Sequence, residues 1–360
     1  MALALRMQNN PLVESGNQMK VRSYQDDLRK TWDDFVLSQP EGTLFHLTAW
    51  KRAIEAEFGF EPRYLLAEDD GRICGVLPLF LSTNWMQGPT LISTPFAVYG
   101  GICSSHFAAS VALREAACRM ATEERVNYLE LREPYHPAGD GFLTKELYVT
   151  FQQELTPDTE RLMRGLPKDT RYMIRKGQKS GLRAVTDNDQ LDSFYEIYSH
   201  SVRNLGTPVF SKRFFQRLLT EFGNTVEVMV IWQKSEAMGA VLSFRFRDAI
   251  HPYYSGSLYE GRQFGTNNFM YWEVLRAACE SGLRTFDFGR SKLGTGSYFF
   301  KTQWNMRERP LPYQFYLVRR KSLPNFSPAN PSFKLATSIW KRIPLPVTKT
   351  LGPSLVRLFP

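Results

Sequence analysis

Apolar and polar residues alternate along the first half of the chain in patterns typical of helices and strands. The spacing of the large apolar residues predicts helices within residues 27–58. Residues 64–81 contain two apolar runs that flank the sequence DDG at 69–71, which predicts a β-hairpin. Residues 107–125 are rich in good helix formers, and residues 127–133 alternate as a strand does.

The second half repeats this order of elements. A second hairpin is predicted at residues 226–246, a second helix at 268–281 and a second strand at 284–290. Glycines in the two hairpins, at positions 75 and 239, are 164 residues apart, and the two strands begin 157 residues apart. Such similar offsets indicate a duplicated α/β unit.

The duplication and the length of 360 residues together predict two domains of similar size, since one domain usually has about 100–200 residues. The predicted fold class is α/β (α+β), with a mixed twisted sheet flanked by helices in each domain. We expect the first domain at residues 1–155 and the second at 156–320. Residues 321–360 are expected to form a proline-rich basic tail that wraps over the body without a core of its own.

Charge is concentrated in two zones, although the net charge of the whole chain is only +9. Residues 161–183 contain eight Lys or Arg and one Asp, and residues 309–360 contain nine Lys or Arg and no acidic residue. The remainder has a net charge of −7, because 28 basic residues there oppose 35 acidic ones. Two basic zones on an acidic body indicate specific anionic partners.

Several classes of protein are disfavoured by what the sequence lacks. The four cysteines form no CxxC pair and have no histidine at metal-binding spacing, so we expect no metal site and no disulfide framework. The five histidines are scattered and no GxSxG motif occurs, which disfavours hydrolysis by a serine or cysteine nucleophile. There is neither a signal peptide nor a run of about 18 apolar residues, so we expect a cytoplasmic protein, which could still be peripheral at the inner face of the membrane.

The first candidate site is a basic helix. Arg164, Lys168, Arg171, Arg175 and Lys179 follow one another at spacings of three and four residues, which would place five cations on one helical face. This face is expected to bind the phosphates of an anionic donor or substrate. The competing interpretation is an ordinary solvated basic surface.

The second candidate site is a tyrosine-rich strand that leads through a glycine-containing loop into a helix, at residues 251–275. Tyr254 and Ser255 lie on the strand, and Asn268 lies near the start of the helix, where backbone N–H groups can hold a phosphate or carboxylate. No GxGxxG fingerprint is present. An ordinary strand followed by a capped helix is the competing interpretation.

The third candidate site, at residues 286–304, has the highest density of polar side chains. A predicted strand end and a glycine-rich loop bring together Asp287, Arg290, Ser291, Lys292, Ser297, Tyr298 and Lys301. Ligands bind outside strand ends in α/β sheets, which suits a site here. Lys301 lies between Phe300 and Trp304, where partial desolvation would strengthen its charge toward a developing oxyanion. A purely structural loop is the less favoured alternative.

Four stretches of the sequence resemble the FemAB family of acyltransferases, which belongs to the GNAT superfamily. They are RYMIRKGQKSGL at 171–182, the helix at 194–215, YYSGS at 253–257 and FDFGRSKLGTGSYFFKTQW at 286–304. RNLGTP combined with GRSKLGTGSYFFK is most similar to the subgroup found with bacterial exosortase (PEP-CTERM) and exopolysaccharide systems. One departure is Asn305, where many members have glycine.

The resemblance implies two tandem GNAT-like domains and a reaction that forms an amide. The acyl group, often an amino acid from aminoacyl-tRNA, would be transferred to an amine on a cell-envelope or exopolysaccharide precursor. Lys301 matches the lysine of the family's Phe-Lys motif, which is thought to stabilise the oxyanion, and residues 168–179 match a region associated with an anionic substrate or donor.

From residue type and position we expect Asp287 to act as a base or to orient the amine, and Tyr254 or Tyr298 to protonate the leaving group. The residues expected to bind the substrate or the donor are Lys168, Arg171, Arg175, Lys179, Arg203, Ser255, Asn268, Arg290, Ser291, Lys292, Ser297 and Trp304.

Two alternatives to aminoacyl transfer stay open. One is an N-acetyltransferase that uses acyl-CoA, although no R/Q-x-x-G-x-G/A loop is found where a pyrophosphate would bind. The other is a non-catalytic protein that binds a polysaccharide or a lipid-linked sugar. In the enzymatic interpretations no cofactor is bound tightly, the donor is aminoacyl-tRNA or acyl-CoA, and the acceptor is a nucleotide- or lipid-linked saccharide or peptide.

The tail supports a separate prediction about membranes. Phe333, Ala336, Trp340 and Ile343 would share one helical face beside Lys334, Lys341 and Arg342, which suits contact with an anionic membrane. The alternative is that this tail packs against its own domain.

Overall fold

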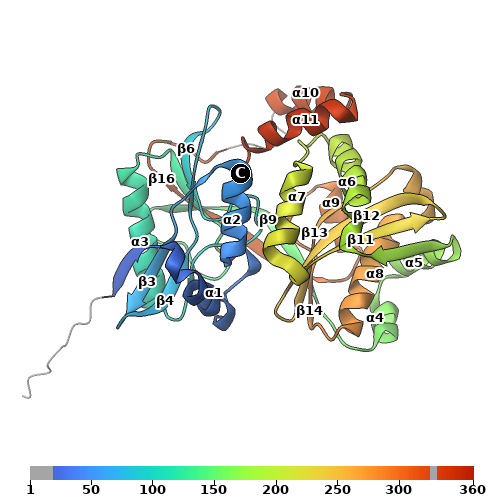
Figure 1. Ribbon diagram of the computed structural model, residues 1–360, viewed down its shortest axis with the longest axis horizontal. Coiled ribbons are helices and arrows are strands. Elements are labelled where there is room, and N and C mark those ends of the chain that lie inside the picture. Colours follow the sequence, from blue (N-terminus) through green and yellow to red (C-terminus); the bar gives the residue numbers. More distant parts are fainter. Residues whose placement is uncertain (1–18, 325–330) are drawn as a thin grey trace, which may run out of the picture.

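The structure, a computed structural model, describes residues 19–324 and 331–360 as two β-sheets with helices packed on their faces (Figure 1). The smaller sheet has the order β1-β3-β4-β7. The larger, twelve-stranded sheet has the order β10-β11-β12-β13-β14-β9-β16-β8-β6-β5-β2, and β15 pairs with β9. The strands are β1 (Lys20–Ser23), β2 (Glu61–Pro62), β3 (Leu65–Asp69), β4 (Arg72–Leu77), β5 (Phe80–Asn84), β6 (Gly88–Ile92), β7 (Cys103–Ser104), β8 (Tyr128–Leu131), β9 (Phe142–Glu154), β10 (Leu182–Thr186), β11 (Val226–Gln233), β12 (Glu236–Phe246), β13 (Ala249–Ser257), β14 (Thr285–Asp287), β15 (Ser291–Lys292) and β16 (Arg307–Leu317).

The helices cover the sheets and include several short 3₁₀ turns. The α-helices are α1 (Arg29–Ser38), α2 (Thr48–Phe58), α3 (Phe107–Glu123), α4 (Thr159–Gly165), α5 (Lys168–Lys179), α6 (Leu191–Leu205), α7 (Lys212–Phe222), α8 (Thr266–Glu280), α9 (Gly296–Thr302), α10 (Pro331–Trp340) and α11 (Leu345–Val356). The 3₁₀ turns are η1 (Asp26–Leu28), η2 (Leu44–His46), η3 (Asn188–Gln190), η4 (Gly223–Thr225) and η5 (Glu260–Phe264).

The predicted fold class is confirmed, and so are the repeated elements. Both hairpins form as β3–β4 and β11–β12, and the helix after each is α3 or α8. The basic segment, however, was predicted as one helix and is two. The break between α4 and α5 lies at Leu166 and Pro167, whose ψ angles of 148° and 151° are extended.

Two long strands join the halves of the chain into one sheet. β9 and β16 pair antiparallel, for example at Val149↔Pro310. β16, from the second half, also pairs with β8 of the first half, and β9 pairs with β14 of the second half. The sheet is therefore continuous, and the division at residues 155 and 320 stays a prediction about domains.

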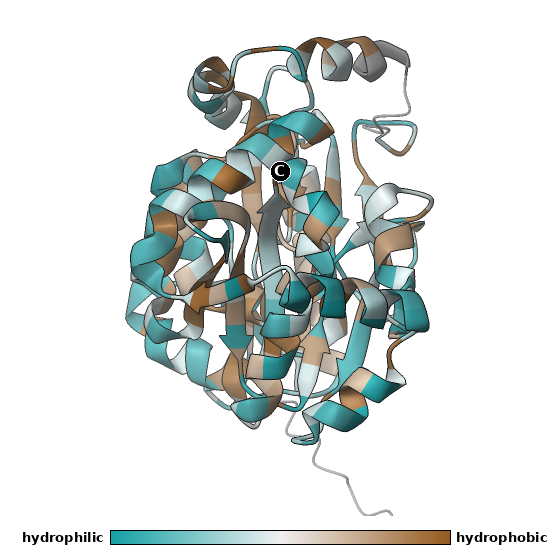
Figure 2. Cartoon of the chain, turned by 90° about the vertical axis from the view of Figure 1, so that its right-hand side faces the viewer, coloured by the Kyte–Doolittle hydropathy of each residue, from teal (hydrophilic) through white to brown (hydrophobic). Residues whose placement is uncertain are grey.

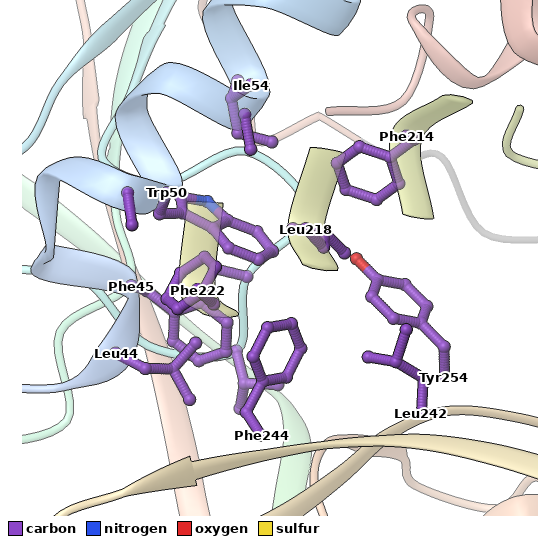
Figure 3. Close-up of a cluster of buried hydrophobic side chains, with 14 of the residues drawn as sticks. Leu44, Phe45, Trp50, Ile54, Phe214, Leu218, Phe222, Leu242, Phe244 and Tyr254 are labelled. Carbon is purple, nitrogen blue, oxygen red and sulfur yellow. The ribbon is translucent and has the colours of Figure 1, made fainter. Parts of the chain in front are cut away.

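Aromatic side chains from both halves share the largest hydrophobic core. The ring of Trp50 on α2 lies 6.5 Å from Phe214 on α7 and 6.3 Å from Phe244 on β12. Figure 3 shows these side chains meeting between α2, α7 and the sheet. Large buried aromatics contribute much of the hydrophobic stabilisation of a core. The first and second halves are thus packed as one body around the site described below.

The C-terminal tail forms α10 and α11, which pack onto the second half next to α6 and α7 (Figure 1). The indole N–H of Trp340 donates to the carbonyl of Thr207 at 3.0 Å, and only 8% of Trp340 is exposed. The prediction that Trp340 belongs to a membrane-facing surface is therefore wrong. The side chains of Phe333 and Lys334 lie outside the described part of the structure. Within the described residues, no helix has the length and apolarity needed to span a bilayer.

Candidate active site

A cavity of about 570 Å³ opens where β13 and β14 separate. The two strands pair in parallel at Ala249↔Thr285 and Ile250↔Phe286. Beyond these positions, the segments 253–255 and 288–290 line the cavity. A cavity of this size at the ends of diverging strands is a usual place for a ligand site in an α/β fold.

Three segments that are far apart in the sequence meet at this cavity. They contribute Gly206, Thr207 and Pro208 from the turn after α6, Tyr253, Tyr254 and Ser255 from β13, and Gly289, Arg290, Ser297 and Lys301 from the glycine-rich loop and α9. Each segment belongs to one of the stretches that carry the family resemblance. The structure therefore brings three of those four stretches to one place.

The glycine-rich loop turns the chain so that α9 can present Lys301. Gly294 adopts a φ of 73°, which favours glycine, and the Thr295 hydroxyl donates to the carbonyl of Lys292 at 2.7 Å. Trp304, just after the helix, is buried 5.6 Å from the ring of Phe288. This packing fixes the end of α9 against Phe288, and Lys301 is directed inward.

The amine of Lys301 is held by backbone carbonyls. Nζ donates to the carbonyl oxygens of Phe288 at 2.5 Å, Gly289 at 2.8 Å and Arg290 at 3.3 Å, and the residue is only 8% exposed. Burial lowers the pKa of Lys301 to about 7, and the neighbouring Asp287 and Arg290 act in opposite directions on it. The lysine is therefore a buried amine that changes charge near neutral pH.

This low pKa predicts a particular dependence of stability on pH. In the unfolded chain the lysine has a pKa of about 10.4, so between about pH 7 and 10 the unfolded state binds more protons than the native state. The free energy of unfolding should then rise with pH, by at most about 1.4 kcal/mol per pH unit. Denaturant unfolding of wild type and Lys301→Met at pH 6.5 to 9.5 measures the difference. Parallel curves for the two proteins would contradict the lowered pKa.

Asp287 lies deep in the structure and is surrounded by donors. Its carboxylate accepts hydrogen bonds from the hydroxyls of Tyr99 at 2.5 Å and Thr150 at 2.6 Å, the Gln152 amide at 3.1 Å and the Gly289 N–H at 2.9 Å. It is 2% exposed and does not line the cavity. These contacts join the first half, β9 and the glycine-rich loop.

The environment of Asp287 also disfavours the predicted role as a base. Burial acts to raise the pKa of this carboxyl, but nearby His251 and the hydrogen bonds outweigh burial, so the pKa lies below its ordinary value. A carboxylate with a low pKa and four donors is a weak proton acceptor. The geometry instead favours Asp287 as a positioning residue for the 288–290 loop.

Tyr254 lines the cavity with its ring, but its hydroxyl is directed toward α7, on the side of Leu218 and Phe214 (Figure 3). The hydroxyl has no hydrogen-bond partner among the described residues, and burial holds its pKa well above the ordinary value. An unpaired buried hydroxyl costs about 1–3 kcal/mol. This orientation does not suit the predicted protonation of a leaving group.

Tyr254→Phe is therefore expected to leave the turnover number unchanged and to leave the free energy of unfolding equal or up to about 2 kcal/mol higher. The reason is that the variant removes an unpaired buried hydroxyl and keeps the ring. Steady-state kinetics and denaturant unfolding test this together. A large fall in turnover without loss of stability would instead restore Tyr254 as a proton donor.

Arg290 brings positive charge to the cavity wall. Its guanidinium lies 4.8 Å from the ring centre of Tyr148 and donates to the Tyr313 hydroxyl at 3.0 Å. The residue lies beside these rings, is exposed and lines the cavity. With Lys292 it also lines a second, smaller cavity of about 230 Å³. Arg290 and Lys301 are the cations among the residues that line the larger cavity.

Aromatic residues from several segments build much of the remaining wall. The Tyr253 hydroxyl donates to the carbonyl of Phe96 at 2.7 Å, and Phe96 has a φ of 61°, an unusual angle for a bulky residue. The Tyr271 hydroxyl bonds to Ser255 at 2.7 Å. First-half and tail residues complete the wall: Phe96, Val98, Thr337, Val356 and Phe359. No local pattern in the sequence marks these first-half and tail residues as part of the site.

The predicted basic face is separate from the cavity. Lys168, Arg175 and Lys179 are exposed on α5, whereas Arg171 turns back to donate to the carbonyls of Arg164 and Leu166. The five-cation face on one helix is therefore wrong. Three exposed cations remain on α5, and none of them lines the cavity.

Other predicted residues also lie away from the cavity lining. The Tyr298 hydroxyl donates to Glu308 at 3.2 Å, and the Arg203 guanidinium donates to the carbonyl of Lys341 at 3.0 Å. Ser291, Asn268 and Trp304 are 2%, 8% and 1% exposed, respectively. None of these five residues lines the cavity.

The predicted anion site at the start of α8 is covered. Gly265, just before the helix, lies so close to the Met173 carbonyl of α5 that an added Cβ would come within 2.6 Å of that oxygen. Within residues 19–324 and 331–360, no group of three or more His, Cys, Asp or Glu is placed to hold a metal ion.

Comparisons with known proteins bear on the fold of the chain. Residues 165–302 match the family described as Acetyltransferase (GNAT) domain. No curated protein sequence matches the chain. The fold is similar to the crystal structure of FemX, with a TM-score of 0.65 and 16% identity over 84% of this chain and 98% of that one.

Two further solved structures share the fold. One is a conserved protein of unknown function from Bacteroides thetaiotaomicron VPI-5482, with a TM-score of 0.56 and 9% identity over 83% of this chain and 100% of that one. The other is a tandem GNAT protein from the clavulanic acid biosynthesis pathway, with a TM-score of 0.50 and 11% identity over 82% and 98%. The chain therefore has a FemX-like tandem GNAT fold.

The backbone at Asn305 has a conformation that suits asparagine or glycine. Its φ is 54°, in the left-handed region where glycine is unstrained and asparagine is the next most common residue.

Proposed function

We propose that this protein is an N-acyltransferase that forms an amide at the cavity between β13 and the 288–290 loop. The observation that carries the proposal is the convergence of three family-like stretches on this cavity, with Lys301 and Arg290 in its wall. The match of residues 165–302 to a GNAT domain supports the same chemistry. Transfer of an aminoacyl group from tRNA is the favoured reaction.

The reaction needs little beyond orientation and a positive charge. The amine nitrogen attacks the carbonyl carbon of the donor ester or thioester, so the C–N bond forms while the carbonyl electron pair moves to oxygen. Collapse of this tetrahedral oxyanion breaks the C–O or C–S bond, and the leaving hydroxyl or thiol takes up the proton that the amine loses. A fixed cation next to the oxyanion lowers this barrier.

Lys301 is the group that we assign to the oxyanion. Its longest hydrogen bond, 3.3 Å to the Arg290 carbonyl, is the weakest of the three and is the one most readily exchanged for a substrate oxygen. The other two bonds keep the ammonium in place during the exchange. Arg290 would hold an anionic part of the donor or acceptor.

Two features favour aminoacyl-tRNA over acyl-CoA as the donor. Lys168, Arg175 and Lys179 form an exposed basic strip on α5 next to Tyr172, which is 64% exposed and suits stacking on a base. The Thr170 hydroxyl ties this helix to the carbonyl of Gln303, just after α9. The covered start of α8 leaves little room for a CoA pyrophosphate there.

The wider setting is part of the proposal. RNLGTP and GRSKLGTGSYFFK, which both reach the cavity, support the exosortase-associated subgroup and an acceptor in the cell envelope or an exopolysaccharide. The acceptor would be a nucleotide- or lipid-linked saccharide or peptide. Since both donor classes are made in the cytoplasm, we propose that the reaction occurs there or at the inner face of the membrane.

The test is transfer of a labelled acyl group to amine-bearing acceptors, with charged tRNA and acetyl-CoA as parallel donors. Label transferred from charged tRNA would support the favoured reaction. Transfer from acetyl-CoA alone would replace it with ordinary N-acetylation. Saturable saccharide binding without transfer from either donor would overturn the enzymatic proposal in favour of a binding protein.

A further inference from the structure

The outer side of the C-terminal helices exposes apolar side chains in a regular arrangement. On α10, Leu335 and Ile339 are 68% and 54% exposed, and on α11, Val347 and Leu351 are 43% and 49% exposed. Each pair is spaced by four residues, so each pair lies on one face of its helix. Large exposed apolar patches on a protein surface mark an interaction site.

The inner side of the same helices is fixed to the body. Gly352 approaches Val209 so closely that an added Cβ would lie 2.5 Å from the Val209 carbonyl, and Lys349 forms an ion pair with Glu196 on α6. Thr337 and Val356 line the candidate active-site cavity. The apolar outer face is therefore held in position by an anchored inner face.

An exposed tryptophan lies near the same end of the molecule. Trp85, which is 85% exposed, occupies the turn between β5 and β6. Gln87 in this turn donates a hydrogen bond to the carbonyl of Leu358, just beyond α11. Figure 1 shows the β5–β6 hairpin and the two C-terminal helices reaching the same upper edge. Tryptophan is enriched where proteins meet the membrane interface.

The charges around this surface are basic. Lys341 and Arg342 are exposed between α10 and α11, and Arg319 and Lys321 are exposed in the segment that bonds to Asn127. Asn127 in turn donates to the Gln87 carbonyl at 2.5 Å, which places this segment beside the tryptophan turn. Residues 309–360 contain no acidic residue at all.

From this combination we infer that the outer face of α10 and α11, together with Trp85, docks onto an anionic lipid bilayer. Apolar side chains would enter the interface while the basic residues contact anionic headgroups. A second copy of the chain fits less well, because the exposed basic residues of the two faces would repel each other. Figure 2 shows these helices as a raised element at one end of the molecule.

Docking would place the active site close to the lipid. The helices form the cavity wall on one side and the bilayer contact on the other, and one helix is only about 10 Å across. This inference concerns the membrane surface and does not depend on the identity of the acyl donor. It holds or fails separately from the proposed reaction.

The experiment is co-sedimentation of the full chain with vesicles of phosphatidylcholine alone or with one third phosphatidylglycerol, at about 150 mM salt. We expect wild type to pellet with the anionic vesicles. Two double variants, Leu335→Ser/Ile339→Ser and Val347→Ser/Leu351→Ser, remove the apolar residues of α10 and α11. Each should weaken partitioning of the protein onto anionic vesicles at least about tenfold. The matched control is Leu37→Ser/Phe107→Ser, which changes exposed apolar residues on α1 and α3 and should bind as wild type does.

Three outcomes would overturn the inference. Wild type that stays in the supernatant with anionic vesicles shows that the face does not bind lipid. Unweakened binding of both α10 and α11 doubles shows that the apolar residues are not used. A concentration-dependent dimer that is lost in the same doubles assigns the face to self-association. Thermal unfolding of each variant checks that the exposed substitutions leave the fold intact.

Discussion

Replacing Lys301 with alanine is expected to lower the turnover number by about 100- to 1000-fold, the usual effect of removing one group that stabilises an oxyanion. Lys301 is one of two cations in the cavity wall, and the only one fixed by three backbone carbonyls. Its interaction with the substrate strengthens as the oxyanion forms, so the effect should fall mainly on turnover. The KM for the donor should change far less.

Two further variants separate the charge of Lys301 from its structural contacts. Lys301→Met keeps much of the buried chain but loses the ammonium, so it should be as inactive as Lys301→Ala while retaining more stability. Lys292→Ala removes a neighbouring lysine that lines only the smaller cavity and should retain most of the turnover. If the Lys301→Ala protein is folded and has wild-type turnover, Lys301 does not stabilise the oxyanion.

Reversing the charge of α5 is expected to weaken binding of charged tRNA by about 100-fold or more near 150 mM salt. The variant carries Lys168→Glu, Arg175→Glu and Lys179→Glu, all at exposed positions, so the fold should be retained. If each lysine or arginine contacts one phosphate, the slope of log affinity against log salt should also become shallower by about three. Filter binding over a series of salt concentrations measures both quantities.

The matched control reverses three exposed basic residues of the first half, Lys30, Arg72 and Arg119, and changes the net charge by the same amount. It should bind charged tRNA nearly as wild type does, apart from a small long-range effect. Equal losses in the two variants would show that only net charge matters. If the α5 variant still binds charged tRNA, α5 is not the binding site for the donor. Acyl-CoA would then become the favoured donor.

Much of the fold follows from local patterns. The hairpins at 64–81 and 226–246, the helices at 107–125 and 268–281 and their common order are confirmed, because hydrophobic periodicity and turn residues act within a few positions of the chain. The high density of polar residues in 286–304 likewise identified Lys301 and Arg290 as candidate site residues. Both line the cavity in the structure.

The roles of individual polar residues depended on contacts from distant parts of the chain. Asp287 is a carboxylate, which can act as a base. Hydrogen bonds from Tyr99 of the first half and Thr150 of β9 instead hold it in place. Tyr254 has a hydroxyl that could donate a proton, but this hydroxyl is directed toward α7. Such orientations are set by packing between elements, which no spacing along the sequence records.

The sequence by itself determined the repeated α/β elements, the basic zones and the lysine at the centre of the candidate site. Tertiary structure alone decided that β16 crosses to pair with β8, that Phe96 and the tail help to enclose the cavity, and that Trp340 is turned inward. The physical reason is the distance along the chain over which each signal acts. Periodicity reflects the near neighbours of each residue. A cavity wall is made by segments that only the packing of the whole chain brings together.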